Sequence, residues 1–390
     1  MSTRMEVGDD PATVAATHDG RLDALVASSS LIVTCGPGGV GKTTTAAAIG
    51  LIGARAGRHV VVVTIDPARR LADALGLGRG QTDEPHRVKG LGRLSGSLDV
   101  LMLDAERTFD RMIIERAGPR ADAILQNRVY RSIAGSLSGA QEYMAIERLH
   151  QVHDAGLHDL IVVDTPPSRH AVDILSAPDR LSAFFGHPVY RALTMPGRSM
   201  ARVTSTAATA FSWTVKRLAG PRIVEDTIEL FRAMTGIEEG LKSRAAAVSA
   251  LLRLPSTSFV LVSSPRAEAI DESQHLADAL EQGGYPLHAV VANLVHPLPP
   301  VCDLDPDLVP ADSALAQQLV HHQQLTELAT AERAELRALW TAVAARSAAT
   351  ADGKADPDAE HAVVLCEVPL LDHDVHALDT LAEIADVLTA

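Results

Sequence analysis

The stretch Leu31-Ile32-Val33-Thr34-Cys35-Gly36-Pro37-Gly38-Gly39-Val40-Gly41-Lys42-Thr43-Thr44 decides how this chain folds. A short apolar run leads directly into a segment that fits G-x-x-x-x-G-K-[ST], and an Ala-rich helical pattern follows. Such a loop needs glycines because consecutive backbone N–H groups must turn inward around a phosphate, at angles that a side chain would obstruct. The strand, loop and helix together predict a binding site for the phosphates of ATP. Its residues are Gly36, Gly38, Gly39, Val40, Gly41, Lys42, Thr43 and Thr44.

The side chains of this loop and two aspartates suggest phosphoryl-transfer chemistry. We expect Lys42 to lie against the β- and γ-phosphates and the Thr43 hydroxyl to ligate Mg²⁺. Asp164 follows an apolar run and is predicted to hold a water molecule of the Mg²⁺ shell. Asp66 follows another apolar run and is predicted to orient or deprotonate the attacking water, so Asp66 and Lys42 are the candidate catalytic residues. The alternative is that each aspartate only caps a helix or forms a turn.

The composition favours an α/β protein and excludes several functions. Hydrophobic residues make up 46% of the 390 residues and aromatic residues only 3%, so the core must consist of Val, Ile, Leu and Ala. A net charge of -14 without a basic run argues against nucleic-acid binding. Three isolated cysteines indicate neither a zinc site nor a disulfide framework. We therefore expect a cytoplasmic protein whose contact with membranes is only peripheral.

Short β-branched runs alternate with helical patterns along the chain, which predicts a P-loop NTPase with a mostly parallel, doubly wound sheet flanked by helices. The runs are residues 31–35, 59–65, 98–103, 160–163, 258–262, 289–292 and 362–365. Helices are expected at residues 43–56, 140–153, 273–282 and 313–349. Residues 76–96 are rich in Gly and Arg and are expected to form an irregular surface connection.

We predict a disordered segment at residues 1–20 and a single domain at residues 21–390. Residues 178–255 have helical patterns and no strand, so they are predicted to be a helical insertion within that domain. The insertion contains methionines and aromatic residues that suit a groove for an apolar client helix, but Ala-rich helices also pack on one another. These residues are Met195, Met200, Phe211, Trp213, Phe231 and Met234.

Three motifs in this order resemble the ArsA family of arsenite-pump ATPases and ATPases that target tail-anchored proteins. They are the deviant Walker A loop, the segment Thr64-Ile65-Asp66-Pro67-Ala68-Arg69-Arg70-Leu71-Ala72-Asp73-Ala74 and the segment Val163-Asp164-Thr165-Pro166-Pro167-Ser168-Arg169-His170. The similarity runs from about residue 21 to the C-terminus. The related ATPases MinD and ParA share the first motif but lack the second.

The resemblance implies roles for matching positions. The second and third motifs look like the family's switch I and switch II, and Asp66 falls on its catalytic carboxylate. Asn293 looks like the residue that reads adenine, and an amide has the donor and acceptor that an adenine edge needs. The alternative for Asn293 is a turn residue at the end of a strand. Pro369 looks like part of the loop that packs on the base.

Pro37 departs from the family's pattern. Members carry a second lysine at this position, which reaches the partner's phosphates across a dimer, and proline has neither a cation nor a backbone N–H. Either another cation replaces the lysine, or a paralogous subunit with an intact loop supplies it. Arg69, Arg70 and Arg169 are the nearest candidates by motif. We favour a heterodimer over a homodimer.

The predicted function is an ATPase switch that couples an ATP cycle to a client or partner. The alternative is a nucleotide-binding regulatory or scaffolding subunit with little ATPase activity of its own. A MinD- or ParA-like positioning ATPase is disfavoured, because the acidic C-terminal residues 377–390 form neither a membrane-seeking helix nor a basic face. The cysteines match neither the zinc-linked nor the arsenite-binding arrangement of the family, so neither ligand is expected.

Overall fold

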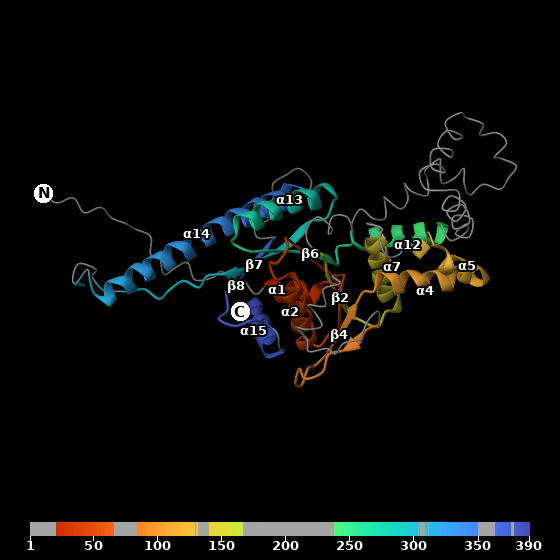
Figure 1. Cartoon of the computed structure of the whole chain (residues 1–390), viewed down its shortest axis with the longest axis horizontal. Helices are drawn as coiled ribbons and strands as arrows, with labels where there is room; N and C mark the ends of the chain where they lie inside the picture. The colour runs from red at the N-terminus through yellow and green to blue at the C-terminus, as the bar shows by residue number, and fades with distance from the viewer. Residues whose placement is uncertain are drawn as a thin grey trace, which may run out of the picture.

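The computed structural model describes residues 21–65, 84–128, 130–131, 140–166, 238–302, 304, 309–310, 312–349, 363–375 and 378–390. Within these residues an eight-stranded sheet forms the centre of the molecule, in the order β3-β4-β2-β5-β1-β6-β7-β8 (Figure 1). The strands are β1 (Leu31–Cys35), β2 (His59–Thr64), β3 (His86–Arg87), β4 (Ser97–Met102), β5 (Leu160–Asp164), β6 (Thr257–Ser263), β7 (Leu287–Val295) and β8 (Val364–Pro369). All neighbouring pairs are parallel except β3 with β4. The predicted mostly parallel α/β fold is confirmed.

The two faces of the sheet carry separate cores because side chains alternate along each strand. Ile32, Val60 and Val62 point to the face covered by α1 (Arg21–Ser28), α2 (Lys42–Arg55) and α15 (Leu378–Thr389). Neighbouring strand residues, such as Val33 and Val61, point to the opposite face. That face is covered by α7 (Ala140–Ala155), α12 (Glu238–Leu251), α13 (Ala267–Gln282) and α14 (Ala314–Ala349). Helices on both faces make the sheet doubly wound, as predicted.

Several observed elements differ from the expected ones. The connection expected at residues 76–96 contains β3, which adds an antiparallel edge strand to β4. Helix α13 begins at Ala267 and not at residue 273, since Glu268 in its first turn is compatible with the helix dipole. Strand β7 continues to Val295, beyond the predicted end at residue 292, through an irregularity where Leu294 has a φ of 63°. Helices α4 (Ala105–Ala117) and α5 (Ala121–Gln126), joined by the short 3-10 helix η2 (Gly118–Arg120), were not predicted.

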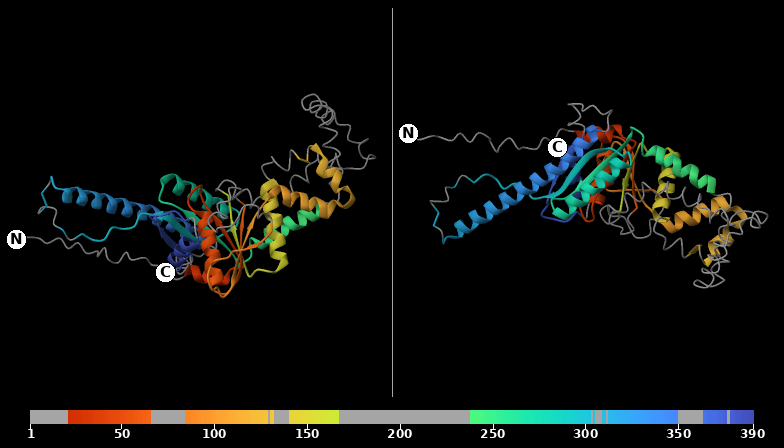
Figure 2. Two further views of the ribbon diagram at one scale, coloured as in Figure 1. Left: turned by 60° about the horizontal axis from the view of Figure 1, so that its bottom comes forward. Right: turned by 90° about the horizontal axis from the view of Figure 1, so that it is seen from above.

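Helix α14 has 36 residues and extends beyond the sheet (Figures 1 and 2). Its second half packs on β7 and α13 through buried residues such as Leu336 and Val343. In its first half, Leu325 and Leu328 are exposed.

Only the end of the predicted helical insertion is described. Residues 238–251 form α12, which agrees with the expected helical character, and residues 178–237 lie outside the described part of the chain. In that part no helix is both long and apolar enough to cross a membrane.

Candidate nucleotide site

The glycine loop lies at the carboxyl edge of the sheet, between the centrally placed β1 and the start of α2. Gly36 lies against β6, and a Cβ atom at this position would be 2.0 Å from the carbonyl oxygen of Val262. Gly41 has a φ of 90°, and a Cβ there would be 2.1 Å from the side-chain nitrogen of Asn293. A larger residue is therefore excluded at both positions, and the backbone remains free to surround a phosphate.

Lys42 is the first residue of α2, and its side chain folds back over the loop. It is buried, and its Nζ donates a hydrogen bond of 2.7 Å to the carbonyl oxygen of Pro37. The ammonium group therefore lies across the loop, at the positive end of the helix dipole. This is the position from which a lysine can contact a phosphate bound by the loop N–H groups.

A hydroxyl and a carboxylate meet beside Lys42. The Thr43 hydroxyl donates to Oδ2 of Asp164 over 2.8 Å, and Asp164 is fully buried at the end of β5. The backbone around Asp164 is held by Thr165, whose hydroxyl donates to the carbonyl oxygen of Thr34 over 2.8 Å. Hard divalent cations prefer oxygen ligands of these kinds, so the pair fits Mg²⁺ bound directly by Thr43 and through water by Asp164.

Thr64 is a third member of this group that the sequence analysis missed. Its hydroxyl donates to the same Oδ2 of Asp164 over 2.9 Å. Thr64 and Asp164 are opposite each other because β2 and β5 are parallel neighbours in that register. The strand order was needed to find this contact, although the position of Thr64 two residues before Asp66 was a clue.

Asn293 connects the far side of the loop to β7. Its side-chain nitrogen donates to the carbonyl oxygen of Val40 over 2.8 Å, so this donor serves the loop itself. No residue in the described part of the chain donates to its Oδ1 atom, which remains able to accept a hydrogen bond from a ligand. Pro369 ends β8 and pairs with Val295, so the structure brings Asn293 and Pro369 to the same edge of the sheet. Their predicted contacts with the base remain predictions.

Several predicted residues lie outside the described part of the chain. They are Asp66, Arg69, Arg70 and Arg169, together with Met195, Met200, Phe211, Trp213, Phe231 and Met234. Their predicted roles in hydrolysis, charge compensation and client binding are not tested by the structure.

Arg266 is a cation near the loop that sequence reasoning did not identify. It lies in the short connection between β6 and α13, and its Nη2 atom is 3.6 Å from the point where a Cβ of Gly39 would lie. Its Nε atom is 3.4 Å from the hydroxyl of the buried Ser264. No sequence motif indicated this proximity, because it depends on β6 lying beside β1.

Cys35 lies directly before the loop but is not a reactive group. Burial raises the pKa of its thiol to about 12, against the weaker opposite effect of Lys42. The thiol is therefore neutral at physiological pH, and it donates a hydrogen bond of 3.5 Å to the carbonyl oxygen of Val260 in β6.

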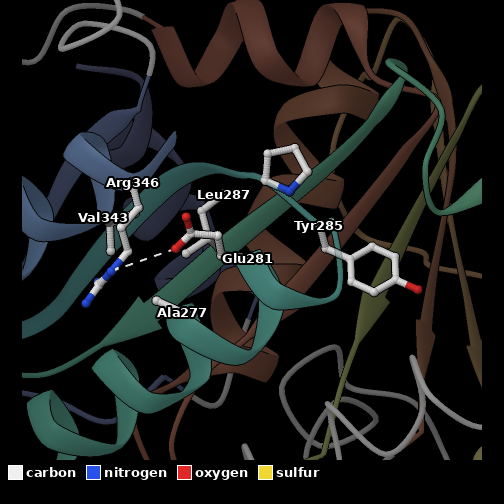
Figure 3. Close-up of a pocket in the computed structure, with 8 residues that line it drawn as sticks. Ala277, Glu281, Tyr285, Leu287, Val343 and Arg346 are labelled. Carbon is white, nitrogen blue, oxygen red and sulfur yellow. Dashed lines mark ion pairs between the residues drawn. The ribbon is translucent and has the colours of Figure 1, made fainter. Parts of the chain in front are cut away.

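The pocket in Figure 3 lies away from the loop, between α13, α14 and the start of β7. Its volume of 160 Å³ is small for a nucleotide, since sites for ligands of that size usually exceed about 300 Å³. Arg346 in its lining pairs with Asp278 at 2.9 Å and lies 3.9 Å from Glu281. Its charge is thus already compensated, and the loop remains the better candidate for the nucleotide.

Comparisons with known proteins agree with this geometry. A family model described as "Anion-transporting ATPase" matches residues 29–304. The chain is 26% identical to "Putative arsenical pump-driving ATPase 1" of Aquifex aeolicus over 68% of this chain and 63% of the relative. It is also 26% identical to "ATPase GET3" of Malassezia globosa, over 68% of this chain and 72% of the relative. "ATPase ASNA1 homolog 1" of Paramecium tetraurelia is 28% identical over 37% of this chain and 42% of the relative.

The chain thus spans less than two thirds of the Aquifex and Paramecium proteins. The family match includes the phosphate loop, Asp164 and Asn293, and the resemblance predicted from the three motifs is confirmed. This chain belongs to the anion-transporting ATPase family.

Proposed function

We propose that this chain binds ATP with Mg²⁺ in the loop of residues 36–44, hydrolyses it, and uses the cycle as a conformational switch. The observation that carries the proposal is the hydrogen bond of 2.8 Å between Thr43 and Asp164 beside the folded-back Lys42. It joins a hydroxyl, a carboxylate and an ammonium group at the mouth of a glycine loop. These three groups are the ones that a nucleoside triphosphate with its metal requires.

Each residue has a defined task in this proposal. The backbone N–H groups of the loop and Lys42 bind and orient the phosphates, and Thr43 and Asp164 hold the metal shell. Mg²⁺, when bound, supplies positive charge that neutralises the phosphate oxygens. Thr64 holds the Asp164 carboxylate in place through its hydroxyl. Asp66 is proposed to orient or deprotonate the attacking water.

The base is proposed to lie between Asn293 and Pro369. The side-chain nitrogen of Asn293 donates to the loop, so its Oδ1 would accept a hydrogen bond from the adenine amino group. Pro369 offers an apolar surface for the ring at the end of the neighbouring strand. This arrangement would connect recognition of the base to the position of the loop.

The switch is proposed to act in a dimer with a paralogous subunit, in the cytoplasm. The relevant feature is Pro37, which presents its carbonyl to Lys42 and has no cation or N–H of its own. A partner with a lysine at the corresponding position would supply the missing charge. A homodimer is the second candidate, with a cation of this chain in place of that lysine.

The partner-dependent cycle is proposed to change the affinity of the helical insertion at residues 178–255 for an apolar protein client. An alternative is a regulatory subunit that binds nucleotide but hydrolyses it slowly. Pro37 keeps this alternative open, because this chain would receive a second cation only from a partner that carries the lysine, and a site without that cation stabilises the transition state less well.

Binding and turnover test the central proposal. We expect calorimetry to show one MgATP site in the purified chain. We expect Lys42→Ala to weaken MgATP binding at least tenfold, since a charge-assisted contact is lost. Asp164→Asn should reduce the Mg²⁺ dependence of that binding. Absence of MgATP binding to the wild-type protein would refute the proposal.

A second experiment separates the switch from the regulatory subunit. The complex is purified from the native host, its subunits are identified by mass spectrometry, and phosphate release is measured with and without Asp66→Asn in this chain. A large loss of turnover indicates that this chain's own site hydrolyses ATP. An unchanged rate, with ATP still bound, favours the regulatory subunit. Recovery of this chain as a homodimer alone would refute the paralogous partner.

A further inference from the structure

Arg266 lies where it can contact a nucleotide held by the loop. Strand β6 is the neighbour of β1, with Leu261 opposite Cys35, so both strands end at the same edge of the sheet. The chain leaves β6 through Ser264 and reaches Arg266 just before α13. From there the guanidinium extends to the loop, with Nη2 at 3.6 Å from a Cβ placed on Gly39.

The side chain of Arg266 has little to do in the fold itself. Arg266 is the N-cap residue of α13, but its side chain makes no capping hydrogen bond. Among the described residues its guanidinium donates only to the Ser264 hydroxyl, over a long 3.4 Å. It is exposed, and no carboxylate in the described part of the chain pairs with it. A positive charge thus lies beside the loop, and the described residues provide no counter-charge for it.

The loop itself is poor in positive charge. Lys42 is the only Lys or Arg among residues 36–44, and its Nζ already donates to the Pro37 carbonyl. A nucleoside triphosphate carries several negative charges along its phosphate chain. Guanidinium groups suit phosphate oxygens because their planar donors can make two hydrogen bonds at once.

We propose that Arg266 is a ligand-binding residue whose guanidinium contacts the phosphates of the nucleotide held in this chain's own loop. The inference rests on the proposed function, because it requires MgATP in the loop. Arg266 then supplies a second positive charge, beside Lys42, to the nucleotide site of its own chain. Arg69, Arg70 and Arg169 belong to the predicted switch segments. Arg266 lies instead in the connection between β6 and α13.

Calorimetric titration with MgATP and MgADP tests this role in the full-length protein. We expect Arg266→Gln to raise the Kd of both nucleotides about tenfold, the usual effect of losing one charge-assisted hydrogen bond. Arg266→Lys should recover part of the affinity, since it restores the charge but not the planar donors. The difference between wild type and Arg266→Gln should shrink at high salt, because an exposed charge is screened.

Arg93→Gln is the matched control, because Arg93 is also exposed but lies before the start of β4, at the opposite edge of the sheet from the loop. We expect it to bind both nucleotides like the wild type. Thermal unfolding without nucleotide should be the same for all these variants. A lower unfolding temperature for Arg266→Gln, with no rescue of binding by Lys, would show a structural role and overturn the inference.

The outcomes also separate this inference from the proposed function. If the wild type binds MgATP and Arg266→Gln binds it equally well, Arg266 has no role at the phosphates and the proposed function stands. If the wild type does not bind MgATP, both the proposed function and the inference fail.

Discussion

Asn293 holds the phosphate loop in place through its side-chain amide. Its amide nitrogen donates to Val40, and its position also limits the size of residue 41. Because the contacted atom of Val40 is a carbonyl oxygen, only a donor is tolerated opposite it. The contact therefore distinguishes an amide from a carboxylate of the same shape.

We expect Asn293→Asp to weaken MgATP binding about tenfold or more. The substitution places a carboxylate oxygen against the Val40 carbonyl, which repels it and displaces the loop. The measurement is the MgATP Kd by calorimetry. Asn127→Asp is the control, since the Asn127 side chain accepts a hydrogen bond from the backbone N–H of Tyr130 and aspartate keeps that acceptor. Equal affinity for both variants would contradict this view of Asn293.

At the scale of elements, a buried ion pair joins two helices behind the sheet. Arg244 of α12 lies 2.5 Å from Glu147 of α7, and both side chains are at most 10% exposed. Burying two charges is costly, so the pair is a weak source of net stability, but removing one partner leaves an uncompensated buried charge. The pair thus constrains how α12, which lies within the predicted insertion, packs on α7.

Neutralising the charge of Glu147 should therefore destabilise the folded protein strongly. We expect Glu147→Gln to lower the free energy of unfolding by about 3 kcal/mol or more. The double variant Glu147→Leu with Arg244→Met should recover most of this loss, since no charge is then buried alone. Urea unfolding measures the free energy of unfolding of the single and of the double variant.

The control is Asp386→Asn, which removes the exposed pair between Arg55 and Asp386 and should cost less than about 1 kcal/mol. A similar cost for Glu147→Gln and Asp386→Asn would contradict the expectation.

A second network ties the edge of the sheet together. Asp99 of β4 accepts hydrogen bonds from Arg87 of β3 and lies 3.0 Å from Nε2 of His158, which precedes β5. Burial alone would raise the pKa of Asp99, but the hydrogen bonds with His158 and Arg87 outweigh it. The pKa of Asp99 is held below its usual 3.8.

This lowered pKa predicts a pH dependence of stability. The folded state favours the ionised carboxylate, so the stabilisation is present above pH 3.8 and is lost as the pH falls through the lower pKa of the folded state. We expect Asp99→Asn to destabilise the protein near neutral pH and to have a smaller effect once the pH has fallen below the pKa of Asp99 in the folded state. Urea unfolding across this range measures the difference. A difference that does not change with pH would contradict a contribution from the charge of Asp99.

At the scale of the whole molecule, the nucleotide site joins segments that are far apart in the chain. The loop follows β1, Asp164 ends β5, and Asn293 lies near the end of β7. Strand β1 lies between β5 and β6, so the carboxyl ends of these strands meet at one edge. A ligand that contacts all of them should stabilise the folded state as a unit.

We expect MgATP to raise the unfolding temperature of the full chain. At about 100 times its Kd the ligand stabilises the folded state by about 2.7 kcal/mol. Differential scanning calorimetry measures the shift, and Lys42→Ala, with an affinity at least tenfold weaker, should lose about half of it or more at the same concentration. A similar shift in both proteins would indicate that ATP binds elsewhere.

The fold class and the centre of the site could be predicted from the sequence because their determinants are local. The alternation of apolar runs and helical patterns predicted the parallel sheet, and the glycine loop lies within nine consecutive residues, 36–44. Asp164 was recognisable because it follows an uninterrupted apolar strand. By contrast, β3 is only two residues long, and its pairing with β4 leaves no periodic pattern to detect.

By itself, the sequence determined that this chain has a phosphate loop of a known family, with Pro37 in place of a lysine. Only the tertiary structure decided that Thr64 shares the Asp164 carboxylate, that Asn293 holds Val40 and that Arg266 lies beside Gly39. Each of these contacts joins residues separated by at least 100 positions. They arise because parallel strands place their carboxyl ends at one edge in an order that differs from the order of the chain, and no local pattern encodes that order.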